Sequence, residues 1–284
     1  MSREVAEFLT TRRARVTPAQ VGLPEGHNRR VPGLRRSEVA TLAGVSVEYY
    51  TRIERGNISG VSPEIIDALA RALLLDDAER SHLFDLAEAE SPVSRRTTRT
   101  RRARARGVHP GLQWVLDGFT GGAAFVRNDR MDIVAANALA RAFYSGVYAL
   151  PEPNIARYVF LDPEAKEFHP EWDAIAATTA AILRTEAGRN PHDRTMQDLV
   201  GELSTRSEEF RRLWAGHDVR IHGTGVKHFR HPEVGDLELT YESLPLDAEP
   251  GLNMTVYVAE PGSASEERLR LLASLAAEDR VGLT

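Results

Sequence analysis

Hydrophobic residues recur at helical spacing through residues 1–90, and turn-forming residues separate the periodic stretches. Val5, Phe8 and Leu9 share one face of the first stretch. Ser or Asp precedes each later stretch, as expected at a helix N-cap, and Gly44 and Gly56 end two of them. We therefore predict an all-α region of five short helices. They span residues 3–14, 38–43, 47–55, 63–74 and 77–87.

The rest of the chain mixes helical and strand-like patterns. The run from Leu237 to Glu242 alternates apolar and polar residues, which is typical of a half-buried strand. Helices are predicted at 111–119, 137–144, 153–160, 171–187, 193–204, 207–214 and 263–277, and strands at 123–127, 131–135, 218–221, 226–231, 237–244 and 254–258. This order predicts an α+β, PAS-like domain whose antiparallel sheet is covered by helices. A cavity between such layers is a common small-molecule site.

Composition narrows the class of protein. The 284 residues include no cysteine, which excludes a disulfide scaffold, a Cys-ligated metal site and thiol catalysis. No apolar run approaches the length of a membrane span, and Met1 to Thr10 lacks the apolar core of a signal peptide. We therefore expect a soluble, cytoplasmic protein without membrane contacts.

Charge is distributed unevenly along the chain. Residues 1–110 carry a net +5, whereas the remainder carries −10. The segment Arg95–Gly107 contains seven arginines and no large apolar residue, so it cannot form a core and is predicted to be a linker, which can also lie along phosphates. These features divide the chain into a first domain at residues 1–90, an Arg-rich linker at 91–108, and a second domain at 109–284. Only the basic first part is expected to meet a polyanion.

The segment from Leu34 to Gly56 has the length and chemistry of a helix-turn-helix. Gly44 can supply the left-handed residue that the tight turn needs, and Val39, Leu42 and Val45 are placed to pack the two helices together. Spacing alone leaves an ordinary helical hairpin as an alternative. The second helix is expected to turn outward side chains that can read bases or bind phosphate.

Specific residues favour the helix-turn-helix. The sequence LRRSEVATLAGVSVEYYTRIERGN resembles the helix-turn-helix of the XRE (Cro/C1-like) class of transcriptional regulators, and SPEIIDALARALLLDDAERSHLFDLA resembles the last two helices of the same five-helix domain. Many members have Gln at the start of the first motif helix, where this chain has Arg36-Ser37. Glu54 is expected to pair internally or to act as a cap rather than touch DNA, because a carboxylate facing phosphate is unfavourable.

The resemblance implies duplex DNA as a partner and assigns roles along the motif. The base-edge side of the reading helix comprises Ser46, Val47, Glu48, Thr51 and Arg52. The expected phosphate contacts are Arg35, Arg36, Arg55 and Asn57, and Tyr49 can do either. Because one such motif buries little surface, a homodimer on a palindromic operator is expected.

The second domain also carries a resemblance. The segments EWDAIAATTAAILR, DLVGELSTRSEEFRRLWAGHDV, GTGVKHFRHPEVGDLELTYESL and GLNMTVYVAEPGSASEERLRLL look like the MmyB-like ligand-binding domain. The resemblance implies a PAS-like fold and an apolar, fatty-acid-like ligand. The family often has Trp where this chain has Ala136, and the missing indole is expected to enlarge or reshape the pocket.

Most aromatic residues of the second domain lie at core-facing spacings, and a few are expected to line the cavity. Trp214 and Tyr241 are the first choices, one from the helical layer and one from the sheet. Asn137 and His217 can orient the polar end of a ligand. The full predicted set comprises Trp114, Phe125, Ala136, Asn137, Phe143, Trp214, His217 and Tyr241.

Two other classes of function remain open on sequence alone. Four histidines, His217, His222, His228 and His231, would make the chain a metal-responsive regulator if their side chains converged. An enzyme with a DNA-binding appendage would need a nucleophile motif or a Gly-rich cofactor loop, and neither is present. We therefore expect no enzymatic activity, no catalytic residue, no bound cofactor and no resident metal.

Overall fold

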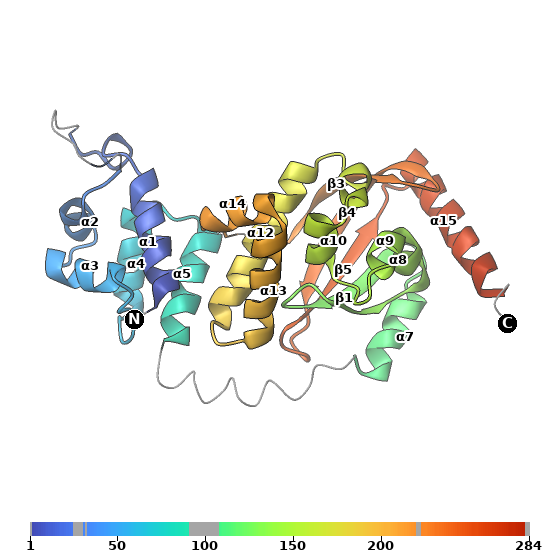
Figure 1. Cartoon of the computed structure of the whole chain (residues 1–284), viewed down its shortest axis with the longest axis horizontal. Helices are drawn as coiled ribbons and strands as arrows, with labels where there is room; N and C mark the ends of the chain where they lie inside the picture. The colour runs from blue at the N-terminus through green and yellow to red at the C-terminus, as the bar shows by residue number, and fades with distance from the viewer. Residues whose placement is uncertain (1, 25–30, 32, 91–107, 220–222, 282–284) are drawn as a thin grey trace. The chain divides into compact units, whose positions relative to one another are not determined.

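The computed structural model describes residues 2–24, 31, 33–90, 108–219 and 223–281. The chain forms two compact units (Figure 1). Unit 1 comprises residues 1–103, 184–194 and 213–221, and unit 2 comprises residues 104–183, 195–212 and 222–284. All but the last residue of the linker predicted at 91–108 lies outside the described part. Within that part, no helix combines the length and the apolar character needed to cross a membrane.

Residues 1–90 of unit 1 contain, in their described part, the five predicted helices and one additional 3₁₀ turn. They are α1 (Arg3–Arg15), η1 (Ala19–Val21), α2 (Arg36–Leu42), α3 (Val47–Glu54), α4 (Pro63–Ala72) and α5 (Asp77–Ala89). Ser46 caps α3 by accepting the Tyr49 N–H, and Asp76 caps α5 by accepting the Glu79 N–H. The cap predicted at Ser37 is wrong: α2 begins at Arg36, and the Glu38 carboxylate accepts the Arg35 N–H at 2.6 Å.

A single apolar cluster joins the helices of unit 1. Phe8 and Leu9 of α1, Val39 of α2, and Tyr50 and Ile53 of α3 are fully buried in it. The turn between α2 and α3 passes through Gly44, whose φ of 67° is the left-handed conformation expected from the sequence. Because these helices have only 7 to 13 residues, packing rather than intrinsic propensity supplies most of their stability.

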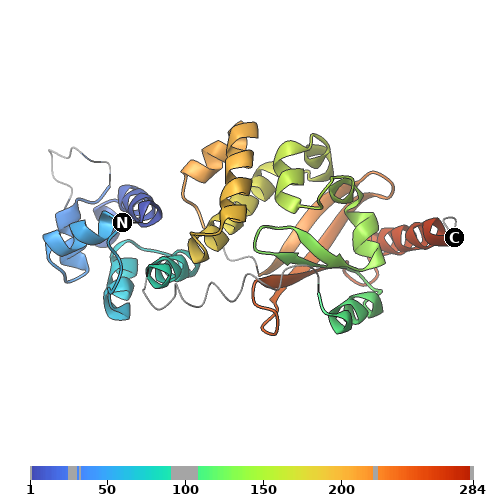
Figure 2. The same cartoon turned by 60° about the horizontal axis from the view of Figure 1, so that its bottom comes forward.

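Unit 2 contains an antiparallel five-stranded sheet in the order β2-β1-β5-β4-β3 (Figure 2). Register is set by pairs such as Phe125 opposite Thr255 and Tyr241 opposite Tyr257. The strand predicted at 218–221 is wrong at residues 218 and 219, which are not strand, and residue 220 begins a stretch outside the described part. The strands are β1 (Ala123–Asn128), β2 (Ile133–Ala136), β3 (Thr224–His231), β4 (Gly235–Pro245) and β5 (Leu252–Val258).

Helices cover both faces of this sheet. On one face, α8 and α15 pack with Phe125, Leu239 and Tyr257 in a large apolar cluster, whereas α7 covers the other face through Leu116 (Figure 2).

Helices α9 and α11 were not predicted, because four or five residues are too few to show a helical period. The helices are α7 (Pro110–Gly118), α8 (Ala138–Phe143), α9 (Ser145–Tyr148), α10 (Ile155–Leu161), α11 (Glu164–Phe168), α12 (Trp172–Arg189), α13 (Arg194–Arg206), α14 (Glu208–Ala215) and α15 (Ala264–Val281).

Candidate functional site

The outer face of α3 presents most of the side chains expected to touch DNA. Val47 is exposed although it is apolar, and Leu42, expected between the two helices, is also exposed. Leu42 does not fill the interface because Val39, Val45 and Ala43 already pack there. Tyr49 and Thr51 are half-buried. The remaining predicted residues are exposed: Arg35, Arg36, Ser46, Glu48, Arg52, Arg55 and Asn57.

A buried carboxylate orients α3. Glu54 is 2% exposed, and its Oε1 accepts hydrogen bonds from Arg13 Nε and from Tyr50 Oη at 3.1 Å. Its Oε2 accepts from Arg36 Nε. Burial, followed by the Glu54 charge, raises the pKa of the Tyr50 hydroxyl, which therefore stays protonated and donates. Glu54 thus ties α3 to α1 and α2, as its predicted internal pairing requires.

The structure gives Arg36 a contact that the sequence did not predict, and its predicted phosphate contact stays a prediction. Its Nε donates to Glu54, so Arg36 holds α3 in place. About half of its side chain remains exposed, at 47%, which leaves the outer guanidinium donors facing solvent. The sequence did not predict the hydrogen bond to Glu54, because an arginine two residues before the helix predicted at 38–43 is equally typical of a phosphate contact.

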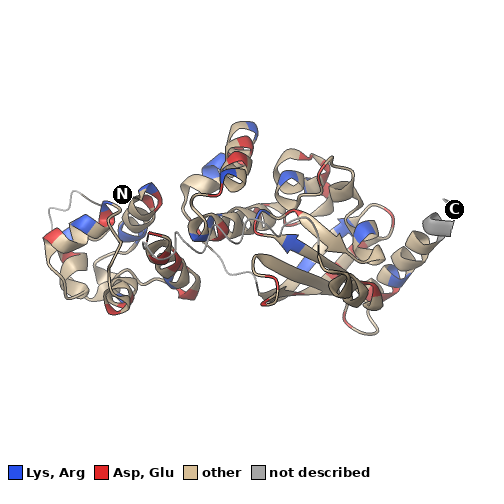
Figure 3. Ribbon diagram, turned by 90° about the horizontal axis from the view of Figure 1, so that it is seen from below, with Lys and Arg blue, Asp and Glu red and all other residues tan. Residues whose placement is uncertain are grey.

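The Arg52 side chain is held over a neighbouring ring. Its guanidinium carbon lies 4.8 Å from the centroid of Tyr49, one turn earlier on α3. Such stacking limits the rotamers that the arginine side chain can adopt. Acidic and basic residues are mixed along the helices of unit 1 (Figure 3), so α3 is not part of an unbroken basic face.

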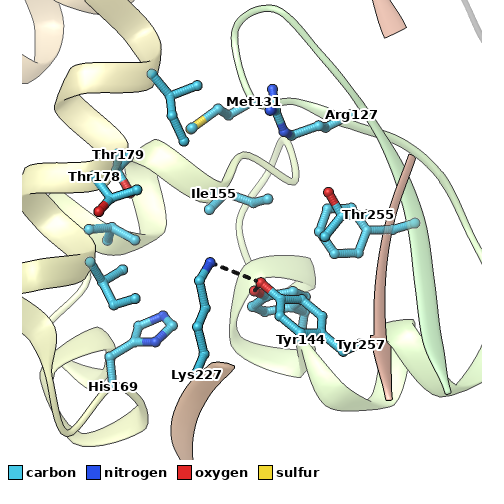
Figure 4. Close-up of a pocket in the computed structure, with 14 residues that line it drawn as sticks. Arg127, Met131, Tyr144, Ile155, His169, Thr178, Thr179, Lys227, Thr255 and Tyr257 are labelled. Atoms are coloured by element: carbon cyan, nitrogen blue, oxygen red, sulfur yellow. Dashed lines mark hydrogen bonds between the residues drawn. The ribbon is translucent and has the colours of Figure 1, made fainter. Parts of the chain in front are cut away.

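Unit 2 contains a small cavity between α12, α10 and the inner face of the sheet (Figure 4). Its volume is about 40 Å³, which is room for about two or three water molecules. A larger molecule therefore enters only if the lining moves. The lining comprises Phe125, Arg127, Met131, Tyr144, Ile155, Val159, His169, Ile175, Thr178, Thr179, Ile182, Lys227, Thr255 and Tyr257.

Lys227 brings a positive charge to this mostly apolar cavity (Figure 4). Its Nζ donates to Tyr257 Oη at 3.3 Å and lies 4.5 Å from the Tyr241 ring centroid. Tyr144 Oη also donates to Tyr257 Oη at 3.3 Å, and burial raises the pKa of Tyr144. Among the described residues, no carboxylate forms an ion pair with Lys227. A ligand that carries a carboxylate would supply the missing counter-charge.

His169 adds a polar group to the same cavity. The residue is 3% exposed, and burial followed by the charge of Lys227 lowers its pKa to about 3. The imidazole is therefore neutral at physiological pH. Within the described residues, its buried Nδ1 has no hydrogen-bond partner. An unsatisfied buried nitrogen of this kind favours a ligand that offers it a donor or an acceptor.

Of the eight residues predicted to line a ligand site, only Phe125 borders the cavity. Trp114 projects from α7 and is 73% exposed. Ala136 and Phe143 are packed in the filled apolar cluster, so the missing indole at Ala136 does not enlarge this cavity. The Asn137 side chain instead caps α8 and bonds the Phe119 and Gly122 carbonyls.

The remaining three predicted residues also lie elsewhere. Trp214 and His217 belong to unit 1, because the end of α14 and the segment after it pack there. Tyr241 contacts Lys227 and Tyr257 but does not line the cavity. Apolar spacing shows which residues point inward, but it does not show which inward residues border empty space. Lys227 had one sequence signal: it is one of only two lysines in the chain and occupies an inward position on a strand.

The described histidines of the predicted metal group do not converge. His217 lies in unit 1, whereas His228 and His231 lie on β3 of unit 2, and His222 is outside the described residues. His228 is exposed and contacts Glu171 and Glu238. His231 is buried and contacts the Ala142 carbonyl. On a strand, residues three apart point to opposite faces, so His228 and His231 cannot share one ion.

Another group could approach a cation. Ligand atoms of Glu4, Glu7 and His217 lie within 4.8 Å of one another in unit 1. Glu4 already pairs with Arg184. Burial, and then the charge of Arg184, lowers the pKa of His217 to about 4. A divalent cation would have to bind beside the Arg184 guanidinium, and repulsion between the two positive charges disfavours its binding.

Comparison with known families agrees with this division of the chain. A family described as a helix-turn-helix domain matches residues 4–83. A second family, described as the MmyB-like transcription regulator ligand binding domain, matches residues 108–272. Among curated proteins, none matches the chain.

Proposed function

This chain belongs to the MmyB-like transcription regulator family, whose ligand-binding domain spans more than half of it, and from that premise we propose that it reads duplex DNA with α3 and responds to an apolar small molecule held in unit 2. At the coarser level, its two domains are those of a DNA-binding transcription regulator with a ligand-sensing domain. The exposed outer face of α3, oriented from behind by Glu54, is the observation that carries the proposal.

Major-groove binding follows from the chemistry of that face. Arg52 can make a bidentate contact to guanine, and the exposed Val47 can contact a thymine methyl group. Arg35, Arg55 and Asn57 flank these residues and are exposed, as phosphate ligands must be. Arg36 can reach phosphate only with the donors that Glu54 does not occupy. The exposed donors that flank α3 are thus placed to bind phosphates on either side of the base-reading residues of α3.

Replacing Arg52 with Ala should weaken specific binding by about 1–3 kcal/mol, because a bidentate base contact is lost. Arg55→Ala should instead weaken all sequences alike, because a phosphate contact carries no sequence information. The measurement is a gel-shift titration on a duplex selected with the parent protein and on a scrambled duplex. Equal affinity of both variants and the parent would show that α3 is not the reading helix.

We propose a homodimer on a palindromic operator. The argument is general: a single helix-turn-helix buries little surface, and paired motifs read half-sites about 34–36 Å apart. Native mass spectrometry of the purified full chain measures the subunit number directly. The same spectrum reports any molecule that co-purifies. A monomer that binds its selected duplex with a single site would overturn the dimer.

The cavity lining favours an apolar ligand with an anionic end, such as a fatty acid. Aliphatic side chains from α10 and α12 supply apolar surface, and Lys227 together with the neutral His169 supplies polar contacts. Because the cavity holds only about 40 Å³, a fatty acid can bind only if side chains of the lining shift. Binding should then stabilise unit 2 by mass action, about 2.7 kcal/mol at a hundredfold excess over Kd.

Replacing Lys227 with Met should lower the affinity for saturated fatty acids about tenfold to a hundredfold, since a charge-assisted hydrogen bond contributes about 1.5–3 kcal/mol. The shift in melting temperature across a series of chain lengths measures the effect. Lys166→Met is the matched control, because Lys166 lies over the Trp172 ring and does not line the cavity. Equal shifts in both variants would exclude Lys227 as the partner of the carboxylate.

A further inference from the structure

Helix α12 contributes residues to both compact units. Its first part provides four of the residues that line the cavity of unit 2: Ile175, Thr178, Thr179 and Ile182. From Arg184 to Arg189 the same helix belongs to unit 1. Thr179 and Arg184 are therefore separated by little more than one helical turn along a single hydrogen-bonded element.

Arg184 is the largest of the fully buried side chains, at 1% exposure. Its two terminal nitrogens donate to the Glu4 carboxylate on α1 and to the Trp214 carbonyl on α14. The guanidinium carbon also lies 3.9 Å from the Trp214 ring centroid. All three residues belong to unit 1. Because the planar guanidinium must satisfy both acceptors and the ring at once, small displacements of Arg184 disturb several contacts together.

Other contacts hold the same end of α12 within unit 1. Gly188 lies against the His82 ring of α5, so closely that a Cβ would come within 2.3 Å of it. Arg189 Nε donates to Asp85 of α5 at 2.9 Å. The end of α12 is thus fixed on α5 and, through Arg184, on α1.

Helix α1 in turn carries a residue that orients α3. Glu4, the partner of Arg184, and Arg13, which donates to Glu54, both lie on α1. Glu54 is the buried carboxylate that positions the outer face of α3. Charged hydrogen bonds therefore tie Arg184 to Glu4 near the start of α1 and Glu54 of α3 to Arg13 near its end, and the α1 backbone joins the two. Helix α12 connects Arg184 to the cavity.

We propose that α12 transmits occupancy of the cavity to the DNA-binding unit, and that Arg184 is the positioning residue through which it acts. The proposal rests on the proposed function, since it names how the same ligand site regulates the same α3 surface. An occupant larger than about 40 Å³ displaces part of the lining, and α12 supplies four of the fourteen lining residues. Displacement of α12 shifts Arg184 against Glu4 and thereby moves α1. The shift is transmitted rather than absorbed, because packed interfaces switch between discrete arrangements and do not deform smoothly.

The test needs neither the ligand nor the operator, so its failure is distinct from failure of the proposed function. Thr179→Phe fills the cavity and stands in for an occupant. Hydrogen–deuterium exchange of the α1 amides is measured in the full-length parent, Thr179→Phe, Arg184→Met and the double variant. In the parent, which keeps Arg184, we expect Thr179→Phe to change the exchange rate of the α1 amides about fivefold or more. In the Arg184→Met protein we expect the same substitution to change that rate less than about twofold.

A merely structural role for Arg184 gives a different result. Arg184→Met would then change the baseline exchange of α1 but leave the factor produced by Thr179→Phe intact. The same factor in both backgrounds, or no effect of Thr179→Phe on α1 in the parent, overturns the proposal. Arg184→Lys keeps the charge but cannot satisfy both acceptors, so it should restore the factor only in part.

Two further variants keep the result interpretable. Arg80→Met removes an exposed ion pair with Asp67 inside unit 1 and should leave the factor as in the parent. If Thr179→Phe does not fold, Thr179→Ile replaces it, because Ile keeps the β-branch and adds less volume. A loss of the factor in Arg80→Met as well as in Arg184→Met would assign the effect to general loosening of unit 1 and would overturn the role of Arg184.

Discussion

Replacing Glu54 with Ala should lower the unfolding free energy of unit 1 by about 3–5 kcal/mol, the usual cost of removing one partner from a buried charge network. Arg13 would keep its charge at 12% side-chain exposure with no carboxylate beside it, and the buried Tyr50 hydroxyl would lose its acceptor. Arg36, at 47% exposure, can regain water and adds less to the loss. Native-state hydrogen exchange of α1 to α4 measures this free energy for unit 1 separately from unit 2.

Glu48→Ala is the matched control for this substitution. Glu48 lies on the same helix, α3, but is exposed, so its removal should change stability by no more than about 0.5 kcal/mol. Glu54→Ala protein that remains folded should still lose affinity for the selected duplex, because α3 is no longer held against α1 and α2. If Glu54→Ala and Glu48→Ala unfold with the same free energy, the buried network does not orient the helix.

Acidification should destabilise unit 1 strongly, and His82 should account for much of the loss. Burial, followed by the charges of Arg184 and Arg12, lowers the pKa of His82 to about 3 from an ordinary value of 6.5. Between these values the unfolded chain binds a proton that the folded chain excludes, so stability falls as pH falls. At about 1.4 kcal/mol per pH unit, the loss from pH 6.5 to pH 4 is about 3 kcal/mol.

His82→Leu should remove this pH dependence, because Leu fills the apolar site beside Phe8 without titrating. A smaller slope should remain, because the pKa of His217 in the same unit is also lowered, to about 4. Hydrogen exchange of α1 and α5 at pH 6.5, 5 and 4 follows both. His228→Gln, followed by hydrogen exchange of β3 and β4 in unit 2, is a control of opposite sign: a hydrogen bond to Glu238 raises the pKa of His228, so its removal costs stability at low pH. An unchanged slope in His82→Leu would refute the assignment.

The sequence by itself determined the elements and the class of protein. Periodicity, caps and the glycine at position 44 predicted the helix-turn-helix with boundaries within about two residues of α2 and α3. Alternation along Leu237–Glu242 predicted a strand of the sheet, and β4 contains it. These features depend on neighbours a few residues apart, so their physical cause is present in the local sequence.

The tertiary structure decided which side chains meet. Arg36 was assigned to phosphate, yet it bonds Glu54, a residue 18 positions away. Trp214 was assigned to the ligand cavity, yet it packs on Arg184 in unit 1. Lys227 and His169, which line the cavity, were not selected at all. Inward spacing is shared by every core residue, so it cannot distinguish a filled core from a cavity.

The division of α12 between the two units shows the same limit most clearly. Its sequence is a continuous helical pattern with no boundary, and the domain limits drawn at residues 90 and 109 stay a prediction that places all of α12 in the second domain. The structure assigns its last turns to unit 1, because Arg184 finds its counter-charge on Glu4, 180 positions earlier in the chain. A buried charge is stable only where a distant partner meets it, and that meeting is a property of the folded chain rather than of any local segment.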